Sequence, residues 1–471
     1  MLSTQTRCQD PPVSIRPGSP LLWGLLIAYL IGLLWTLVIP IFEKPDEIHH
    51  YAYVRYVTDN KRIPIQGTSN PPFVEEESQQ PPLYYLVLST ANYALDRLGI
   101  SDPMIPEWSG LVNPKGPIRT GEEKRFWLSP DGSTVAARGT SRILILRLIS
   151  LAIALLAVPF LIWTMDGLHA YTFWPKLLLI ILFTSLPQMT FIFTSVTNDV
   201  ALVLFSSVVL FFMLSRDISQ RKEAFLLGAA YCLCIYSKQT ALTMMPVVIA
   251  APLIRFGNIK RARIASLLIF LSILIIVGPM YIRNHLIYGD FLARQEIIDP
   301  AFYWWNIDKK SLLSYYFLFE FPRTVTTSFI GQFGFLGIYL PTVMYIVYLL
   351  ILVAGILSES IFFIFGLLRL WPVSQTKDHS SDGALVAQST IMLSLIVLAV
   401  VGLVFYNTQV TQPQGRLLFV AAPSIFVMVA RGLARLIGYV PSYIPAGLLI
   451  CGTLIAMNLI ALFWYVRPYY Y

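Results

Sequence analysis

An acidic pair and a histidine pair lie together where a long apolar run ends. Residues 44–56 read Lys-Pro-Asp-Glu-Ile-His-His-Tyr-Ala-Tyr-Val-Arg-Tyr and follow an uncharged run from Pro20 to Pro40. That run is long enough to cross ~30 Å of hydrocarbon at ~1.5 Å per residue. Carboxylates at a membrane edge can do acid–base chemistry, so this junction is the first candidate for a functional site.

A short helix is predicted directly after this junction. Pro45 suits a first helical turn, where its missing N–H costs nothing. Asp46 and Glu47 would share that turn, where the positive end of the helix dipole favours negative charge. Asp46 and His50 are four residues apart, hence on one helix face, and could share a divalent metal ion. No full set of metal ligands is visible, and a solvated, well-capped helix is the alternative.

The composition assigns the chain to the membrane proteins. Of the 471 residues, 56% are hydrophobic and only 13% are charged, and the mean hydropathy is +0.66. A water-soluble fold cannot hide that much apolar surface, so we predict an all-α polytopic membrane protein. The net charge of +8 then bears on the orientation of the chain in the membrane and does not indicate nucleic-acid binding. The four cysteines form no pattern that predicts a disulfide framework or a zinc site.

About eleven transmembrane helices are expected from the apolar runs. These runs fall at 20–41, 142–165, 174–193, 200–215, 224–237, 240–255, 264–282, 338–368, 384–406, 417–433 and 443–466. The two runs within 224–255 are short, and a re-entrant pair would give the same pattern. The stretch Leu83–Leu95 is also apolar, but its 13 residues suit an interfacial or buried helix better than a crossing.

The basic residues predict the orientation. Arg216, Arg221, Arg255 and Arg261 lie in alternate short loops, which should be cytoplasmic. Residues 1–19 are then a cytoplasmic tail, and 20–471 form one integral-membrane domain. Residues 42–140 become a large extracytoplasmic loop with two interfacial helices, at about 45–59 and 81–97, and 283–337 form a second extracytoplasmic segment.

This topology gathers unusual polar residues on the extracytoplasmic face. They are Asp46, Glu47, His50, Asn198, Asp199, Lys238, Arg283, Tyr288, Gln414 and Arg416. Lys238, Arg283 and Arg416 stand there against the positive-inside bias, and together they suggest a pocket for a phosphate-bearing ligand. Each could instead reach lipid phosphates by itself, and Asp199 could be only a helix cap.

Several short motifs carry a family resemblance. The Pro-Asp-Glu-Ile-His-His stretch resembles the acidic signature of the GT-C superfamily of integral-membrane glycosyltransferases. Gln-Pro-Pro-Leu-Tyr-Tyr at 80–85, Arg-Asn-His-Leu-Ile-Tyr-Gly-Asp at 283–290, Gly-Gln-Phe-Gly-Phe-Leu-Gly at 331–337 and Gln-Gly-Arg-Leu at 414–417 also fit. In their order they are similar to a mostly uncharacterised family of bacterial membrane proteins within that superfamily. Leu417 departs from the aromatic residue expected after Gln-Gly-Arg.

The resemblance implies sugar transfer from a polyprenyl-phosphate donor to a lipid, glycan or protein acceptor on the extracytoplasmic face of a bacterial inner membrane. The protein must then position the acceptor, remove its proton and neutralise the departing phosphate. Asp46 is expected to be the base, with Glu47 as second carboxylate. His50, Asn198 and Asp199 would orient the acceptor, Lys238, Arg283 and Arg416 would hold the donor's phosphate, and Tyr288 and Gln414 would line the pocket. No cofactor is required, although a divalent metal ion remains an option.

Two other functions fit part of the pattern. A ligase or polymerase that moves a glycan from a lipid diphosphate would use the same cations. A transporter or flippase would instead place ionisable residues near the bilayer midplane and show paired repeats or broken helices. The predicted spans are largely free of charge at their centres and show no repeat, which favours the transferase.

Overall fold

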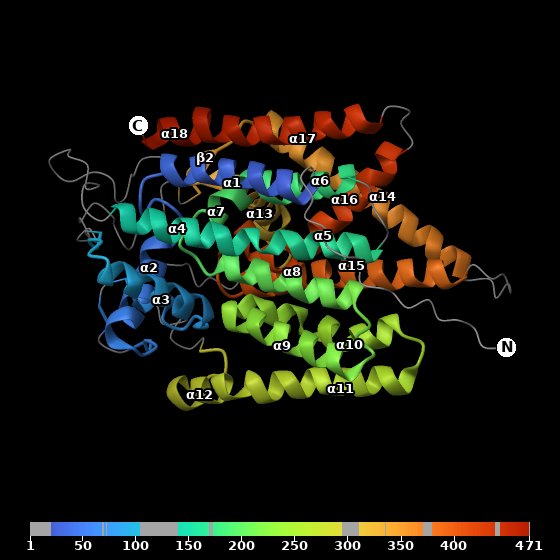
Figure 1. The fold of residues 1–471 in the computed structure, drawn as a ribbon, viewed down its shortest axis with the longest axis horizontal. Coiled ribbons are helices and arrows are strands. Elements are labelled where there is room, and N and C mark those ends of the chain that lie inside the picture. Colours follow the sequence, from blue (N-terminus) through green and yellow to red (C-terminus); the bar gives the residue numbers. More distant parts are fainter. Residues whose placement is uncertain are drawn as a thin grey trace.

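The computed structural model describes residues 20–67, 70–71, 73–103, 140–168, 173–293, 310–334, 336–370, 379–438 and 443–470. Its helices run nearly alongside one another, and two short helices, α2 (Glu47–Asn60) and α3 (Leu83–Arg97), lie at one end of the bundle (Figure 1). The predicted cytoplasmic tail and residues 104–139 of the predicted 42–140 loop lie outside the described residues.

The chain is helical almost throughout its described length. The other helices before residue 200 are α1 (Pro20–Val38), η1 (Glu75–Glu77), α4 (Thr140–Leu155), α5 (Ala157–Leu168), α6 (Phe173–Ser185) and α7 (Pro187–Phe193). Those that follow are α8 (Asp199–Ser215), α9 (Arg221–Ser237), η3 (Gln239–Met244), α10 (Met245–Arg255), α11 (Ile259–Ile276), α12 (Gly278–Tyr288), η5 (Tyr316–Glu320), α13 (Phe321–Ile330), α14 (Thr342–Leu370), α15 (His379–Asn407), η6 (Gly415–Ala421), α16 (Ala422–Gly438), α17 (Tyr443–Ile460), η7 (Ala461–Val466) and α18 (Arg467–Tyr470). The described strands are β1 (Gln332–Phe333) and β2 (Ile338–Tyr339), which pair antiparallel.

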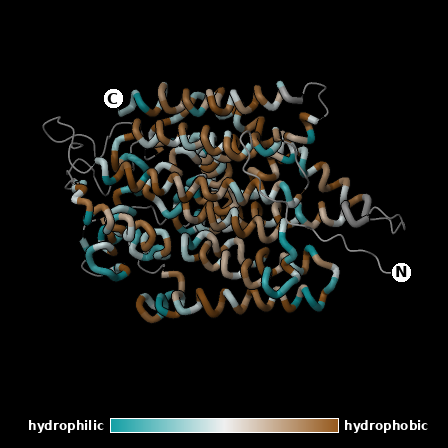
Figure 2. The backbone as a smooth tube through the Cα atoms, in the orientation of Figure 1, coloured by the Kyte–Doolittle hydropathy of each residue, from teal (hydrophilic) through white to brown (hydrophobic). Residues whose placement is uncertain are grey.

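Each predicted apolar run coincides with one helix or with consecutive helices. Within the described residues, six helices are long and apolar enough to cross a membrane, or eight if each of two bent pairs counts as one span. The helices α8, α9 and η3–α10 are shorter, so the count of eleven crossings remains a prediction. Figure 2 shows hydrophobic residues along most of the bundle and hydrophilic ones gathered toward its ends.

Two bends in the bundle occur at prolines. The break between α6 and α7 turns the chain by 68° at Leu186 and Pro187, and the break between α11 and α12 turns it by 41° beside Pro279. Proline cannot donate the backbone hydrogen bond that a continuing helix needs, but it fits the first turn of a new one. The first bend matters for function, because α7 leads into the turn at 194–198, which packs against the start of α2.

The structure corrects two predicted helix starts. Pro45 and Asp46 do not form the first turn of α2, which begins at Glu47. Asp46 is the N-cap residue in the left-handed conformation, with φ 55° and no side-chain cap bond, because its carboxylate faces a different partner. Likewise α14 begins at Thr342 and not at 338, since Ile338 and Tyr339 pair with β1. Helix α3 is shorter than the candidate spans, and its interfacial position stays a prediction.

The two ends of the bundle should face opposite sides of the membrane. Single cysteines replacing the exposed residues Asn60 and Gly99, near α2 and α3, are expected to react with an impermeant thiol reagent on intact cells. Cysteines replacing Gln220 and Gly257, in predicted cytoplasmic loops, should react only after permeabilisation. Cys8 is first replaced by serine; the other three cysteines are buried. Labelling of all four positions on intact cells would contradict the predicted topology.

Candidate active site at the α2–α3 end

Three potential ligand side chains converge at the start of α2. Asp46 and His50 come from the α2 segment and Glu77 from η1, and their ligand atoms lie within 4.8 Å of one another. Sequence reasoning placed Asp46 and His50 on one helix face but did not include Glu77, which η1 brings to the same place. The sequence feature that could have indicated Glu77 is a run of three glutamates at 75–77, shortly before the Gln-Pro-Pro motif.

Arg416 faces this cluster from the far end of the sequence. Its guanidinium pairs with the Asp46 carboxylate, and its Nε donates to the Gln414 side chain at 2.6 Å. The preceding Gly415 packs so closely that a Cβ there would lie 2.3 Å from the backbone nitrogen of Phe329. Only glycine fits this approach, so η6 can hold Arg416 against the cluster.

Asp199 and Lys238 form a second ion pair beside the first. Lys238 Nζ lies 2.7 Å from Asp199 Oδ1, and the other carboxylate oxygen accepts from the Thr197 hydroxyl at 3.3 Å. Asp199 is fully buried and Lys238 nearly so. In this structure, therefore, Asp199 binds a cation and makes no side-chain cap bond, and Lys238 reaches a carboxylate within the protein. The N-cap residue of α8 is Asn198, whose side-chain amide donates to Gln80 at 3.3 Å.

The His50 ring lies between the hydroxyls of Tyr85 and Thr197. Its Nδ1 lies 2.8 Å from the Tyr85 hydroxyl, and its Nε2 lies 3.3 Å from the Thr197 hydroxyl. Tyr85 in turn stacks on Tyr53, with ring centroids 3.7 Å apart. The backbone N–H of Thr197 donates to the hydroxyl of Tyr84 at 2.8 Å. The tyrosines of α3 thus hold the imidazole and the 194–198 turn together.

Burial and neighbouring charge set the protonation of the cluster. Burial alone would raise the pKa of Asp46, but Arg416 and His50 outweigh it and hold that pKa below its usual range. Burial, assisted by Lys238 and Arg416, lowers the pKa of His50 to about 3 against the opposing charge of Asp46. Burial and the adjacent Asp46 raise the pKa of Glu77 to about 8. At neutral pH the site holds a carboxylate, a neutral imidazole and a neutral Glu77.

Glu47 points away from this cluster into the bundle. Both of its carboxylate oxygens bind the guanidinium of Arg147 on α4, at 2.8 and 2.6 Å. They also accept from the backbone N–H groups of Val196 and Phe42, at 3.1 and 2.9 Å. Glu47 is fully buried, so the acidic pair expected to act together is divided between two environments.

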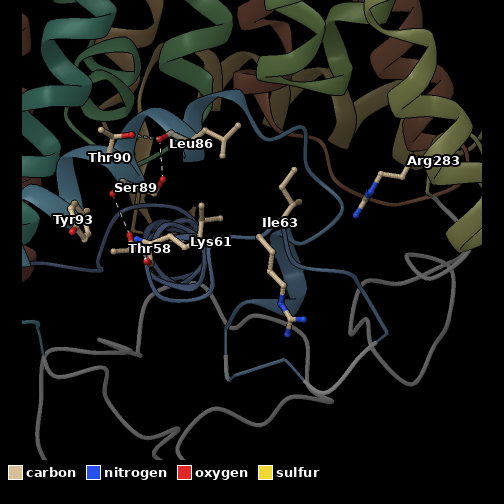
Figure 3. A pocket seen from close by; sticks show the side chains of 10 residues that line it. Thr58, Lys61, Ile63, Leu86, Ser89, Thr90, Tyr93 and Arg283 are labelled. Atoms are coloured by element: carbon tan, nitrogen blue, oxygen red, sulfur yellow. Dashed lines mark hydrogen bonds between the residues drawn. The ribbon is translucent and has the colours of Figure 1, made fainter.

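Arg283 and Tyr288 belong to a neighbouring region. Arg283 lines a cavity of about 720 Å³, whose lining includes no member of the acidic cluster. In Figure 3 its side chain extends from α12 toward the residues of α2 and α3. The lining residues are Val57, Thr58, Lys61, Arg62, Ile63, Leu86, Ser89, Thr90, Tyr93 and Arg283. Tyr288 accepts from the backbone N–H of Gln66 at 3.2 Å. Sequence reasoning had grouped Arg283 with Lys238 and Arg416. In the structure, the cations that share a cavity with Arg283 are Lys61 and Arg62.

A metal ion fits the Asp46, His50 and Glu77 cluster. Glu77 Oε2 is buried and has no hydrogen-bond partner among the described residues, and it lies 3.9 Å from His50 Nδ1. One imidazole and two carboxylates form a mixed nitrogen and oxygen set that suits Zn²⁺ or Mn²⁺ and leaves coordination positions open. A ring nitrogen of His50 would exchange its hydroxyl contact for the ion, and Glu77 would lose its proton.

The comparisons with known proteins give structural neighbours only. No protein-family model and no curated protein matches the chain. An oligosaccharyltransferase from Archaeoglobus fulgidus, tethered with an acceptor peptide, aligns at a TM-score of 0.49 and 12% identity over 96% of this chain and 54% of that one. The same enzyme in complex with Zn and sulfate aligns at 0.49 and 12% over 93% and 52%. ArnT from Cupriavidus metallidurans, bound to undecaprenyl phosphate, aligns at 0.44 and 13% over 95% and 74%.

Both neighbours are GT-C superfamily membrane glycosyltransferases, the class that the sequence motifs resemble. The chain spans little more than half the length of the oligosaccharyltransferase. With identities of 10–13% and TM-scores of 0.44–0.49, no residue role is transferred from either structure. The roles assigned below rest on the geometry of this chain.

Metal binding at the cluster can be measured without any substrate. Mn²⁺ titration of the purified protein, followed by electron paramagnetic resonance, should detect a site that Glu77→Gln and Asp46→Asn each weaken by at least ~10-fold, since each removes a ligand. Glu76→Gln is the matched control, because Glu76 pairs with His49 at 3.0 Å and stands outside the cluster. Equal Mn²⁺ affinity in the wild type and Glu77→Gln would show that this cluster is not a metal site.

Proposed function

We propose that the protein is a membrane glycosyltransferase that moves a sugar from a polyprenyl-phosphate donor to an acceptor hydroxyl. The observation that supports this most directly is the meeting of Asp46, His50 and Glu77 with the cations Arg416 and Lys238 at one end of an apolar helical bundle. A lipid-linked donor needs an apolar bundle for its tail, cations for its phosphate and a carboxylate near its sugar.

Asp46 serves as the general base in this proposal. The acceptor oxygen attacks the anomeric carbon from the face opposite the phosphate, the bond from that carbon to the phosphate oxygen breaks, and the acceptor proton passes to Asp46. The stereochemistry is then inverted, and polyprenyl phosphate departs with the bonding electrons. While Asp46 is paired with Arg416 its carboxylate is a weak base. Movement of Arg416 toward the negative charge of the arriving donor would raise the pKa of Asp46 and make it a stronger base.

The second part of the site is the cavity beside α12, which we assign to the donor's phosphate. Lys61, Arg62 and Arg283 offer three cations to one cavity, and the Thr58, Ser89 and Thr90 hydroxyls lie on its lining (Figure 3). Guanidinium forks and ammonium groups both bind phosphate well. Lys238 and Arg416 are paired with Asp199 and Asp46 here, and we assign them to the phosphate charge that develops as the donor bond breaks.

The remaining predicted residues take supporting roles. Glu47 has a structural role and does not touch the substrate, because Arg147 occupies its carboxylate. His50, Asn198 and Asp199 orient the acceptor, and Tyr288 and Gln414 hold the walls of the site. A divalent ion held by Asp46, His50 and Glu77 would supply positive charge at the acceptor hydroxyl, beside the base. The reaction then takes place on the extracytoplasmic face of a bacterial inner membrane, with α2 and α3 as interfacial helices among eleven spans.

Purified protein given radiolabelled polyprenyl-phosphate sugars should transfer label to an acceptor in membrane extract. Asp46→Asn should lose ~10²–10⁴-fold in turnover, because the amide cannot take a proton at neutral pH. Expression and detergent stability should stay near the wild type. Asp59→Asn is the matched control, since Asp59 lies on the same helix in a surface pair with Arg55.

Three results would contradict this proposal in whole or in part. Failure of the wild type to move label from any polyprenyl-phosphate sugar would remove the proposed activity. Full turnover per folded molecule in Asp46→Asn would leave the transferase but end the catalytic role of Asp46. Transfer of label only from a lipid-diphosphate glycan would instead identify a ligase or polymerase.

Neutralising the α12 cavity should affect donor binding. Arg283→Ala and Lys61→Ala are each expected to raise the donor KM ~10–100-fold, as loss of one charge-assisted hydrogen bond predicts. The acceptor KM should change little. Arg97→Ala is the control, since Arg97 is exposed at the end of α3 and lies outside the lining. An unchanged donor KM in both cavity variants would place the phosphate elsewhere.

A further inference from the structure

The junction between α1 and α2 is held by one arginine from a distant helix. Arg147 of α4 is fully buried, and all of its guanidinium nitrogens take part in hydrogen bonds. Its Nη1 donates to the carbonyls of Thr36 and Ile39, at 3.2 and 2.6 Å, and its Nη2 donates to that of Pro40 at 2.7 Å. The remaining donors bind the two carboxylate oxygens of Glu47.

Of the three carbonyls, that of Thr36 belongs to the last turn of α1, and those of Ile39 and Pro40 follow directly after the helix. The last carbonyls of a helix have no partner within it and must find one outside. In an apolar bundle water is scarce, so an arginine that gathers these carbonyls supplies what solvent would supply elsewhere. The planar fork of five N–H donors matches three carbonyls and a bidentate carboxylate, which a lysine ammonium cannot do.

The same contact determines where Asp46 stands. Asp46 lies between Pro40 and Glu47, both bound to Arg147, and its own backbone is left-handed with φ 55°. Aspartate is one of the few residues with a Cβ that adopt this conformation, so the contacts on either side decide where its carboxylate points. Lys44, fully buried and bonded to the Thr194 hydroxyl at 2.6 Å, holds the segment from the other side.

We propose that Arg147 is a positioning residue, which holds Asp46 in its reactive geometry by clamping Glu47 and the end of α1. This inference rests on the proposed function, because it assumes that Asp46 reacts. Arg147 itself contacts no member of the Asp46, His50 and Glu77 cluster among the contacts described above. Its effect on the reaction therefore passes through the 36–47 backbone.

Arg147→Lys tests this proposal because it keeps the charge and loses the fork. Turnover per folded molecule should fall ~10–100-fold, the scale expected when a reacting group is misplaced by about 1 Å. The donor KM should change less than threefold, because the phosphate cavity is untouched. Hydrogen exchange measured by mass spectrometry should rise in residues 39–50 and stay unchanged in α9–α11. Glu47→Gln, which retains the carbonyl contacts, should show the same pattern more weakly.

Arg142→Lys is the matched control. Arg142 is a second buried arginine on α4, but it pairs with Asp96 and Asp102, at 2.9 and 3.3 Å, at the far end of α3. It should keep wild-type turnover. Wild-type turnover in Arg147→Lys, or an equal fall in both lysine variants, overturns the positioning role. The exchange measurement needs no activity, so an inactive wild type would refute the proposed function, whereas unchanged exchange in residues 39–50 would refute the clamp itself.

Discussion

The site depends on the pairing of buried carboxylates with cations that come from distant parts of the chain. An unpaired charge inside a membrane protein costs several kcal/mol, roughly, unless a partner or a hydrogen-bond set compensates it. Glu47 meets Arg147, Asp46 meets Arg416, and Asp199 meets Lys238. These pairs join α2, α4, α8, η6 and the end of α9. The same ion pairs therefore set the electrostatics of the site and hold this end of the bundle together.

The pairs differ in what they leave free for chemistry. The Glu47 pair is saturated, with both carboxylate oxygens and all guanidinium nitrogens engaged. The Asp46 pair is partly open, since the Asp46 side chain is 28% exposed and Glu77 stands beside it. A saturated buried pair suits a fixed support, whereas a partly open one can exchange its partner for a substrate. This contrast separates a structural carboxylate from a reactive one only one residue away.

The same principle acts elsewhere in the bundle without forming a proposed site. Glu359 of α14 is buried between Arg431 and Arg435 of α16 and accepts from Ser389. There α14 and α16 approach so closely that a Cβ on Gly432 would lie 1.9 Å from the carbonyl oxygen of Gly355. The small residues permit the crossing, and the ionic group sits beside it. Charged residues therefore occur inside predicted spans, which the sequence analysis described as largely free of charge at their centres.

Hydropathy along the sequence was enough to predict the helical membrane class, the apolar runs and the two short helices, because these depend on composition and length over local windows. It also singled out Asp46, His50, Asp199, Lys238 and Arg416, since charge is conspicuous at the ends of apolar segments. It could not separate Glu47 from Asp46, because that division depends on Arg147, a hundred residues away. Nor could it bring Glu77 to the cluster or move Arg283 to a cavity with Lys61, because both follow from how the 61–82 segment and α12 pack. Only the tertiary structure decides which buried charges meet.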